Sequence, residues 1–124
     1  MSVAFAGAGL LAIVAALAHS YLGERYILRR LLRSPELPRL FRDPVFTARV
    51  LRLAWHATSI AWLGLGVVLL ALARPAVSAA LVARIVGITF LVTAGYVLAG
   101  SRGRHLAWIL FLVVGVAALW AASR

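Results

Sequence analysis

The chain has 124 residues, of which 65% are hydrophobic, and its mean hydropathy of +1.03 is far above that of a soluble domain, which is about 45–50% apolar. The formal net charge of +10 comes from arginines that lie between long apolar runs, which favours a membrane protein and argues against a nucleic-acid-binding domain. The absence of cysteine excludes disulfides, thiolate metal sites and thiol catalysis.

Four uncharged runs, at 1–23, 53–73, 85–101 and 105–123, are each long enough to be part of a membrane helix, which needs roughly 17–25 apolar residues. Inside a bilayer the backbone must pair within each segment, which favours helices. We therefore predict an all-α, polytopic membrane domain with four transmembrane helices in an up-down bundle. The predicted helices cover about 2–22, 44–73, 76–100 and 104–122, with a basic cytoplasmic loop at 23–43.

The first predicted helix carries a stripe of small residues, at Ala4, Ala8, Ala12 and Ala16. Such stripes let helices approach closely in lipid, so we expect this face to pack against protein and to support self-association into a homo-oligomer. The same face continues for one more turn to His19 and Ser20. We therefore expect His19 to point at protein, and Gly23 to permit a bend at the end of the helix.

Arginines alternate with apolar residues over 24–34, and the apolar positions share one helical face: Ile27, Leu28, Leu31 and Leu32. This pattern predicts a basic amphipathic helix that lies on the membrane surface and contacts anionic lipid headgroups. Farther on, Asp43-Pro44 is a typical helix start, with Asp as the N-cap and Pro at the first helical position.

The arginines also predict the orientation of the chain, because positive residues collect in cytoplasmic loops. Ten arginines fall on one side of the predicted topology: 25, 29, 30, 33, 39, 42, 49, 52, 102 and 104. Only Arg74, Arg84 and Arg124 fall on the other. We therefore expect a bacterial inner-membrane protein with its N- and C-termini on the periplasmic side.

This topology brings four ionisable residues to one depth near the cytoplasmic face: His19, Glu24, His56 and His105. Two imidazoles and a carboxylate without sulfur suit a divalent transition metal such as Zn²⁺ or Cu²⁺, with His105 as a fourth ligand. His19 and Glu24 are five residues apart, however, which is about 140° around an α-helix. A shared site would need the chain to bend at Gly23.

Three other interpretations stay open for the same layer. These side chains could be interfacial polar groups without a ligand. They could mark a path for protons or other ions, since ionisable groups in membrane helices often do so. His19 and His56 could also ligate a single haem b between two helices, with arginines at the propionates. Small four-helix membrane proteins of haem metabolism share this general layout.

Two stretches carry a resemblance: His19-Ser20-Tyr21-Leu22-Gly23-Glu24, and Arg52-Leu53-Ala54-Trp55-His56 with Ser59 and Trp62. With these stretches the chain resembles small uncharacterised four-helix inner-membrane proteins of bacteria, a resemblance that implies a class but no activity. We expect a non-enzymatic membrane protein with a polar or cation-binding site at its cytoplasmic face. The alternatives are a haem-binding redox protein and a structural or partner-binding subunit of a membrane complex.

Overall fold

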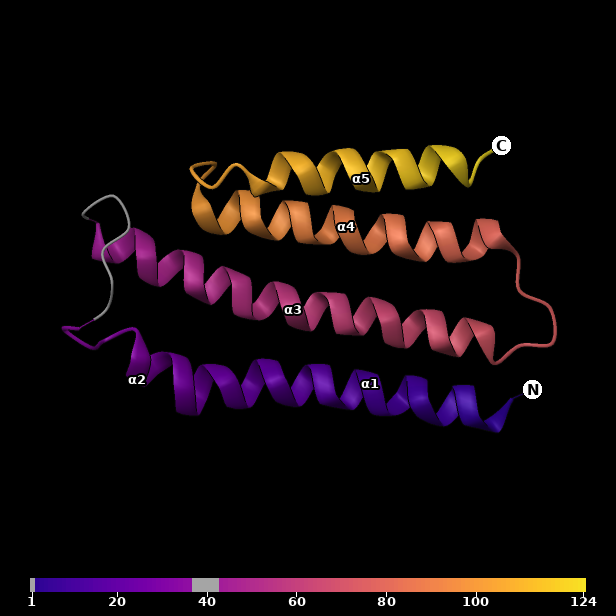
Figure 1. Ribbon diagram of the computed structural model, residues 1–124, viewed down its shortest axis with the longest axis horizontal. Coiled ribbons are helices and arrows are strands. Elements are labelled where there is room, and N and C mark those ends of the chain that lie inside the picture. The colour runs from indigo at the N-terminus through magenta and orange to yellow at the C-terminus, as the bar shows by residue number, and fades with distance from the viewer. Residues whose placement is uncertain (1, 37–42) are drawn as a thin grey trace.

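The computed structural model describes residues 2–36 and 43–124, and these residues form an all-α structure (Figure 1). Its elements are α1 (Val3–Leu22), the π-helix η1 (Gly23–Leu28), α2 (Arg29–Leu31), α3 (Pro44–Leu72), α4 (Ala79–Ser101) and α5 (Ala107–Ala121). Three helical stretches are long and apolar enough to cross a membrane: Val3–Leu31, Pro44–Leu72 and Ala79–Ser101. The fourth, α5, is apolar but has 15 residues, fewer than the sequence predicts.

The first helix does not bend away at Gly23. It passes through η1 into α2 and keeps its direction, as Figure 1 shows. A π-helix pairs residues i and i+5, so the backbone stays hydrogen-bonded and the helix can continue. The predicted bend at Gly23 is therefore absent, because the first basic residues continue the first helix. The rest of the predicted loop includes residues 37–42, with Arg39 and Arg42, which lie outside the described residues.

Side-chain caps fix the starts of the later helices. Asp43 Oδ1 accepts the backbone N–H of Phe46 at 3.0 Å, as the Asp-Pro pattern predicts for α3. This hydrogen bond lowers the pKa of the Asp43 carboxyl, with a smaller contribution from Arg104. Ser78 Oγ accepts the N–H of Leu81 at 3.1 Å, so α4 begins after Ser78 and not at residue 76.

A turn between α4 and α5 delays the start of the last helix. Arg102 and Gly103 both have positive φ, at 53° and 77°, which ends α4. The backbone N–H of His105 then donates to Ser101 Oγ at 3.3 Å, and His105 Nδ1 accepts the N–H of Ala107 at 3.4 Å. The predicted start at residue 104 is therefore wrong by three residues, because residues 102–106 form this hydrogen-bonded turn.

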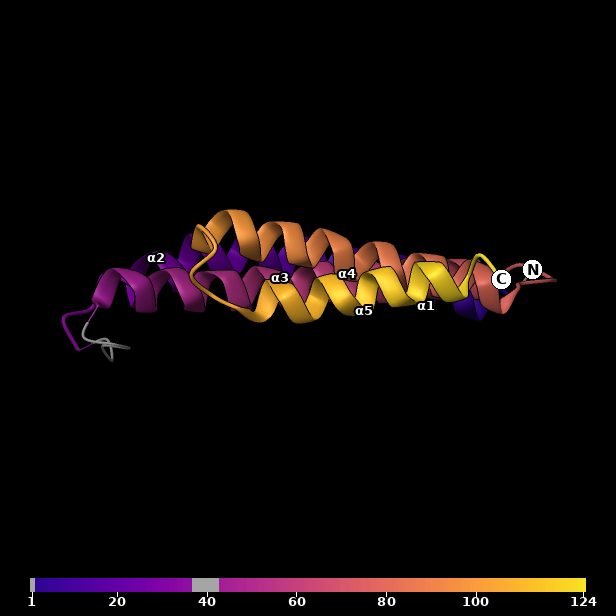
Figure 2. The ribbon, with the colours of Figure 1, turned by 90° about the horizontal axis from the view of Figure 1, so that it is seen from above.

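The helices lie side by side in chain order and alternate in direction (Figure 1). Viewed from above, they form a shallow layer (Figure 2). Within the described residues, α1 has no Cα atom within 8 Å of one in α4 or α5, and α3 has none within 8 Å of one in α5. The four helices therefore form an open row, whereas the sequence predicts an up-down bundle.

Glycines bring the helix backbones together at two contacts in this row. A Cβ atom on Gly9 of α1 would lie 2.9 Å from the carbonyl oxygen of Gly66 in α3, and one on Gly87 of α4 would lie 3.0 Å from that of Gly115 in α5. Small residues permit such close packing in membrane helices. The predicted alanine stripe is only partly correct, since Ala16 is buried while Ala4 and Ala8 are exposed. The contact face of α1 is rotated toward Gly9.

Candidate functional site

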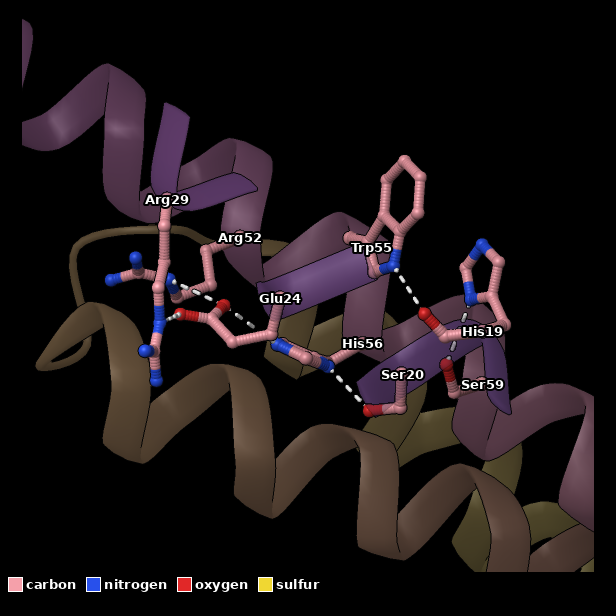
Figure 3. Close-up of polar contacts among 8 residues, drawn as sticks. All are labelled: His19, Ser20, Glu24, Arg29, Arg52, Trp55, His56 and Ser59. Carbon is pink, nitrogen blue, oxygen red and sulfur yellow. Dashed lines mark hydrogen bonds and ion pairs between the residues drawn. The ribbon is translucent and has the colours of Figure 1, made fainter. Parts of the chain in front are cut away.

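Two reciprocal histidine–serine hydrogen bonds join α1 to α3 near the arginine-rich end of the row (Figure 3). His19 Nδ1 of α1 lies 3.0 Å from Ser59 Oγ of α3. In the opposite sense, His56 Nδ1 of α3 lies 2.7 Å from Ser20 Oγ of α1. Each helix thus contributes one imidazole and one hydroxyl, and the two pairs fix the register of α1 against α3.

His19 is held by aromatic side chains of α3. Its ring stacks on Trp55, with the ring centroids 4.4 Å apart and an interplanar angle of 4°, and Trp62 lies at 4.8 Å. Trp55 Nε1 also donates to the backbone carbonyl of His19 at 3.0 Å. The prediction that His19 points at protein is confirmed.

Gly23, the first residue of η1, makes this contact with Trp55 possible. It is buried, and a Cβ atom there would collide with the indole of Trp55. The indole therefore occupies the space that a side chain at position 23 would need. Since π-helical turns are frequent at functional sites, the position of η1 beside the two histidine–serine pairs marks this region as the candidate site.

Glu24, the next residue of η1, is surrounded by cationic and imidazole groups. Its Oε2 accepts from Arg52 Nε at 3.1 Å and lies 3.4 Å from His56 Nε2, while Oε1 lies 3.6 Å from Arg29 Nε. The carboxylate therefore links η1 to α2 and α3 (Figure 3). Both ring nitrogens of His56 have partners, Ser20 at Nδ1 and Glu24 at Nε2.

His56 lies where three helices meet. The ring of Tyr96 in α4 is edge-on to its imidazole, with the ring centroids 6.3 Å apart. Two open hollows are lined by both His56 and Ser20. One, of about 400 Å³, also reaches Ser59 and Tyr96. The other, of about 460 Å³, reaches Glu24 and the first arginines of η1 and α2. His56 is therefore the titratable group common to both hollows.

The predicted metal ligands are not gathered at one point. Glu24 and His56 are adjacent, but His19 hydrogen-bonds toward Ser59, and His105 lies in the turn before α5. Over residues 2–36 and 43–124, no three His, Cys, Asp or Glu side chains are placed to hold a metal ion. The physical reason is local: the π-turn aligns Glu24 with Ser20 and His56, while the tryptophans hold the His19 ring elsewhere.

A haem between His19 and His56 does not fit this arrangement either. Bis-histidine ligation needs one free nitrogen from each ring on opposite faces of a common space. Both nitrogens of His56 are instead bonded within the protein, and the His19 ring is stacked on Trp55. The predicted haem ligands are thus part of two separate hydrogen-bonded pairs.

Sequence reasoning identified the two histidines and Glu24 but not the groups that bind them. Ser20, Ser59 and Arg52 supply these partners. One signal was present in the sequence: His56 and Ser59 are three residues apart and so share a helical face, and His19 is next to Ser20.

Comparison of the chain with protein-family models, curated proteins and solved structures finds no match. The resemblance to small bacterial inner-membrane proteins therefore stays a prediction. A functional assignment depends on the geometry of the site between α1, η1 and α3.

Proposed function

We propose that the protein is an integral membrane protein whose helices cross the bilayer with the arginine-rich end in the cytoplasm. Large apolar side chains on the outer helices are exposed, for example Leu11 at 71% on α1 and Leu110 at 68% on α5, as lipid contact would require. Both termini lie at the end of the row opposite α2 (Figure 1). The excess of arginine near α2 supports a periplasmic location for both termini.

A reporter fused after Arg124 tests this orientation. Alkaline phosphatase at this position should be active, and green fluorescent protein at the same position should be dark, because the first folds only outside the cytoplasm and the second fluoresces inside it. The same reporters inserted after Gly103, in the turn between α4 and α5, should give the opposite pair of signals. A fluorescent C-terminal fusion would contradict the proposed orientation.

Within this membrane protein, we propose that His56 and Glu24 form a site that takes up and releases a proton on the arginine-rich side. The observation that carries the proposal is that His56 is bonded at both nitrogens, by Ser20 Oγ at 2.7 Å and Glu24 Oε2 at 3.4 Å. Imidazole changes charge between about pH 5 and 8, which makes it the side chain best suited to proton exchange in cells.

Serine and glutamate satisfy both charge states of this imidazole. In the neutral ring, Nε2–H donates to Glu24 and Nδ1 accepts the Ser20 hydroxyl proton. In the charged ring both nitrogens donate, and Ser20 needs only to rotate its hydroxyl to become the acceptor. The heavy atoms can stay in place, so proton exchange needs no repacking of α1 against α3.

The charges at Glu24 favour a proton over a metal cation. Its two oxygens already face Arg52 at 3.1 Å and Arg29 at 3.6 Å. A metal ion would have to displace these guanidinium groups from the carboxylate oxygens. A proton instead binds to an imidazole that already has both of its hydrogen-bond partners in position.

Nitrogen NMR of histidine-labelled protein in lipid nanodiscs tests the proton site. When the sample is taken from neutral to acidic pH, His56 should change from one protonated nitrogen to two, a gain of one proton. The indole signal of Trp55 should keep its position, because the packing does not change. His56→Gln assigns the resonance by removing it. A His56 ring that keeps one protonation state over this range would contradict the proposal, as would loss of the Trp55 signal on acidification.

A further inference from the structure

The hollow of about 460 Å³ beside His56 has a positively charged wall. Arg25 and Arg29 line it, while Glu24 is its only acidic residue among those that the structure describes. Glu24 faces Arg52 and His56 on the α3 side, and the Arg29 side chain is 62% exposed against 27% for Glu24. The outer part of the hollow is therefore lined by guanidinium groups, while the carboxylate is engaged farther in.

Arg25 is held in place without being neutralised. Its Nη1 donates to Tyr21 Oη at 2.9 Å, which fixes the guanidinium against the helix. Within the described part of the chain, no carboxylate is close enough to form an ion pair with it. A guanidinium has five N–H donors in a planar fork that matches a phosphate, so most of the donors of Arg25 remain available.

The two arginines also repel each other. Arg25 of η1 and Arg29 of α2 both line the hollow, and like charges that share one wall repel each other. An anion between them would remove this repulsion. Volumes of roughly 300–1,000 Å³ are typical of ligand pockets, so the hollow has room for such a group.

Polarity along the first helix changes in the order expected for a lipid. Leu17, Tyr21 and Arg25 follow each other at four-residue spacing and all line the hollow. Leu17 is apolar and 57% exposed, Tyr21 is amphipathic, and Arg25 is charged. An acyl chain beside Leu17 would place the phosphate beside Arg25 and Arg29. A free inorganic anion has no apolar part that could contact Leu17 at the other end of the hollow.

We propose that this hollow binds one anionic phospholipid, with its phosphodiester between Arg25 and Arg29 and the start of an acyl chain along Leu17. Basic pockets between membrane helices are known to hold such headgroups. The proposal rests on the proposed membrane location, but it does not depend on proton exchange at His56. The two can therefore fail separately, since the NMR titration reads His56 alone.

Native mass spectrometry of the full chain in neutral detergent tests the site. Phosphatidylglycerol is the probe, and phosphatidylcholine is the comparison. The wild type should retain one phosphatidylglycerol in preference to phosphatidylcholine. Arg25→Gln with Arg29→Gln should weaken this binding roughly tenfold or more. Arg30→Gln with Arg33→Gln, which makes the same change of charge at exposed positions outside the hollow, should leave it nearly unchanged.

The single substitution Arg25→Gln is the control for misfolding of the double variant, because it leaves the ion pairs of Glu24 with Arg29 and Arg52 in place. It should also weaken phosphatidylglycerol binding. Equal weakening by the two double substitutions would overturn the proposal in favour of general surface attraction. Displacement of the lipid by excess inorganic phosphate would overturn it in favour of a free-anion site. Equal retention of phosphatidylcholine would show that no anionic headgroup is selected.

Discussion

Leucine in place of Gly87 is expected to separate α5 from α4. A Cβ atom at position 87 would lie 3.0 Å from the carbonyl oxygen of Gly115 and 2.8 Å from Leu119, so the helices must move apart. Overpacking of this kind typically costs about 1–3 kcal/mol. Within the described residues the Cα atoms of α5 come within 8 Å of those of α4 and of no other helix, so α4 provides its principal contact. We expect the free energy of unfolding in mixed micelles to fall by about 3 kcal/mol.

Gly95 provides the matched control on the same helix. A Cβ atom there would meet no atom within 4 Å, so Gly95→Leu adds the same side chain without a clash. It should leave the unfolding free energy unchanged or raise it slightly, since leucine is a better helix former than glycine. Proteolysis near Ala121 should become faster in the Gly87→Leu protein only. Equal stability of the two variants would show that the α4–α5 contact is not as close as described.

Hydropathy alone located the four helices, because a long uncharged run has few other stable structures. It could not locate the start of α5. That start depends on the positive φ angles of Arg102 and Gly103 and on the hydrogen bonds of His105. Apolar composition continues through this turn, so a run-length argument places the helix too early.

The sequence predicted the depth at which the ionisable residues lie, but it did not predict their hydrogen-bond partners. The arginine pattern correctly brought His56 and Glu24 to the same end of the molecule. Which side chains touch was decided by helix rotation, and an angle of 100° per residue does not hold through a π-turn. The metal and haem interpretations both assumed that His19 would join Glu24 or His56. The His19 ring instead hydrogen-bonds Ser59 of α3. Ser59 lies two helical turns along α3 from Arg52, which binds Glu24.

The open row of helices could not have been read from the sequence either. Small residues occur on several faces of the apolar segments, and composition does not show which face is used. The observed contacts follow the glycines that allow backbone approach, such as Gly9 with Gly66. Two residues of the predicted alanine stripe, Ala4 and Ala8, are exposed instead.

Alanine in place of Gly23 is expected to disrupt the whole site through a single methyl group. The new Cβ would collide with the indole of Trp55, a rigid ring that stacks on His19 and donates to its carbonyl. Trp55 must move, which breaks its hydrogen bond and releases the His19 ring. We expect a loss of about 1–3 kcal/mol in unfolding free energy and a changed nitrogen NMR signal for His19.

Gly7→Ala on the same helix isolates the cause, because a Cβ atom at position 7 meets nothing within 4 Å. This control should gain up to about 1 kcal/mol from the better helix propensity of alanine. Trp55→Leu in the Gly23→Ala background should restore part of the loss, since removing the indole removes the collision. The double variant would then be more stable than the sum of the single effects predicts, which is the signature of a direct contact. Additive effects would mean that Gly23 is required for the π-turn itself and not for its contact with Trp55.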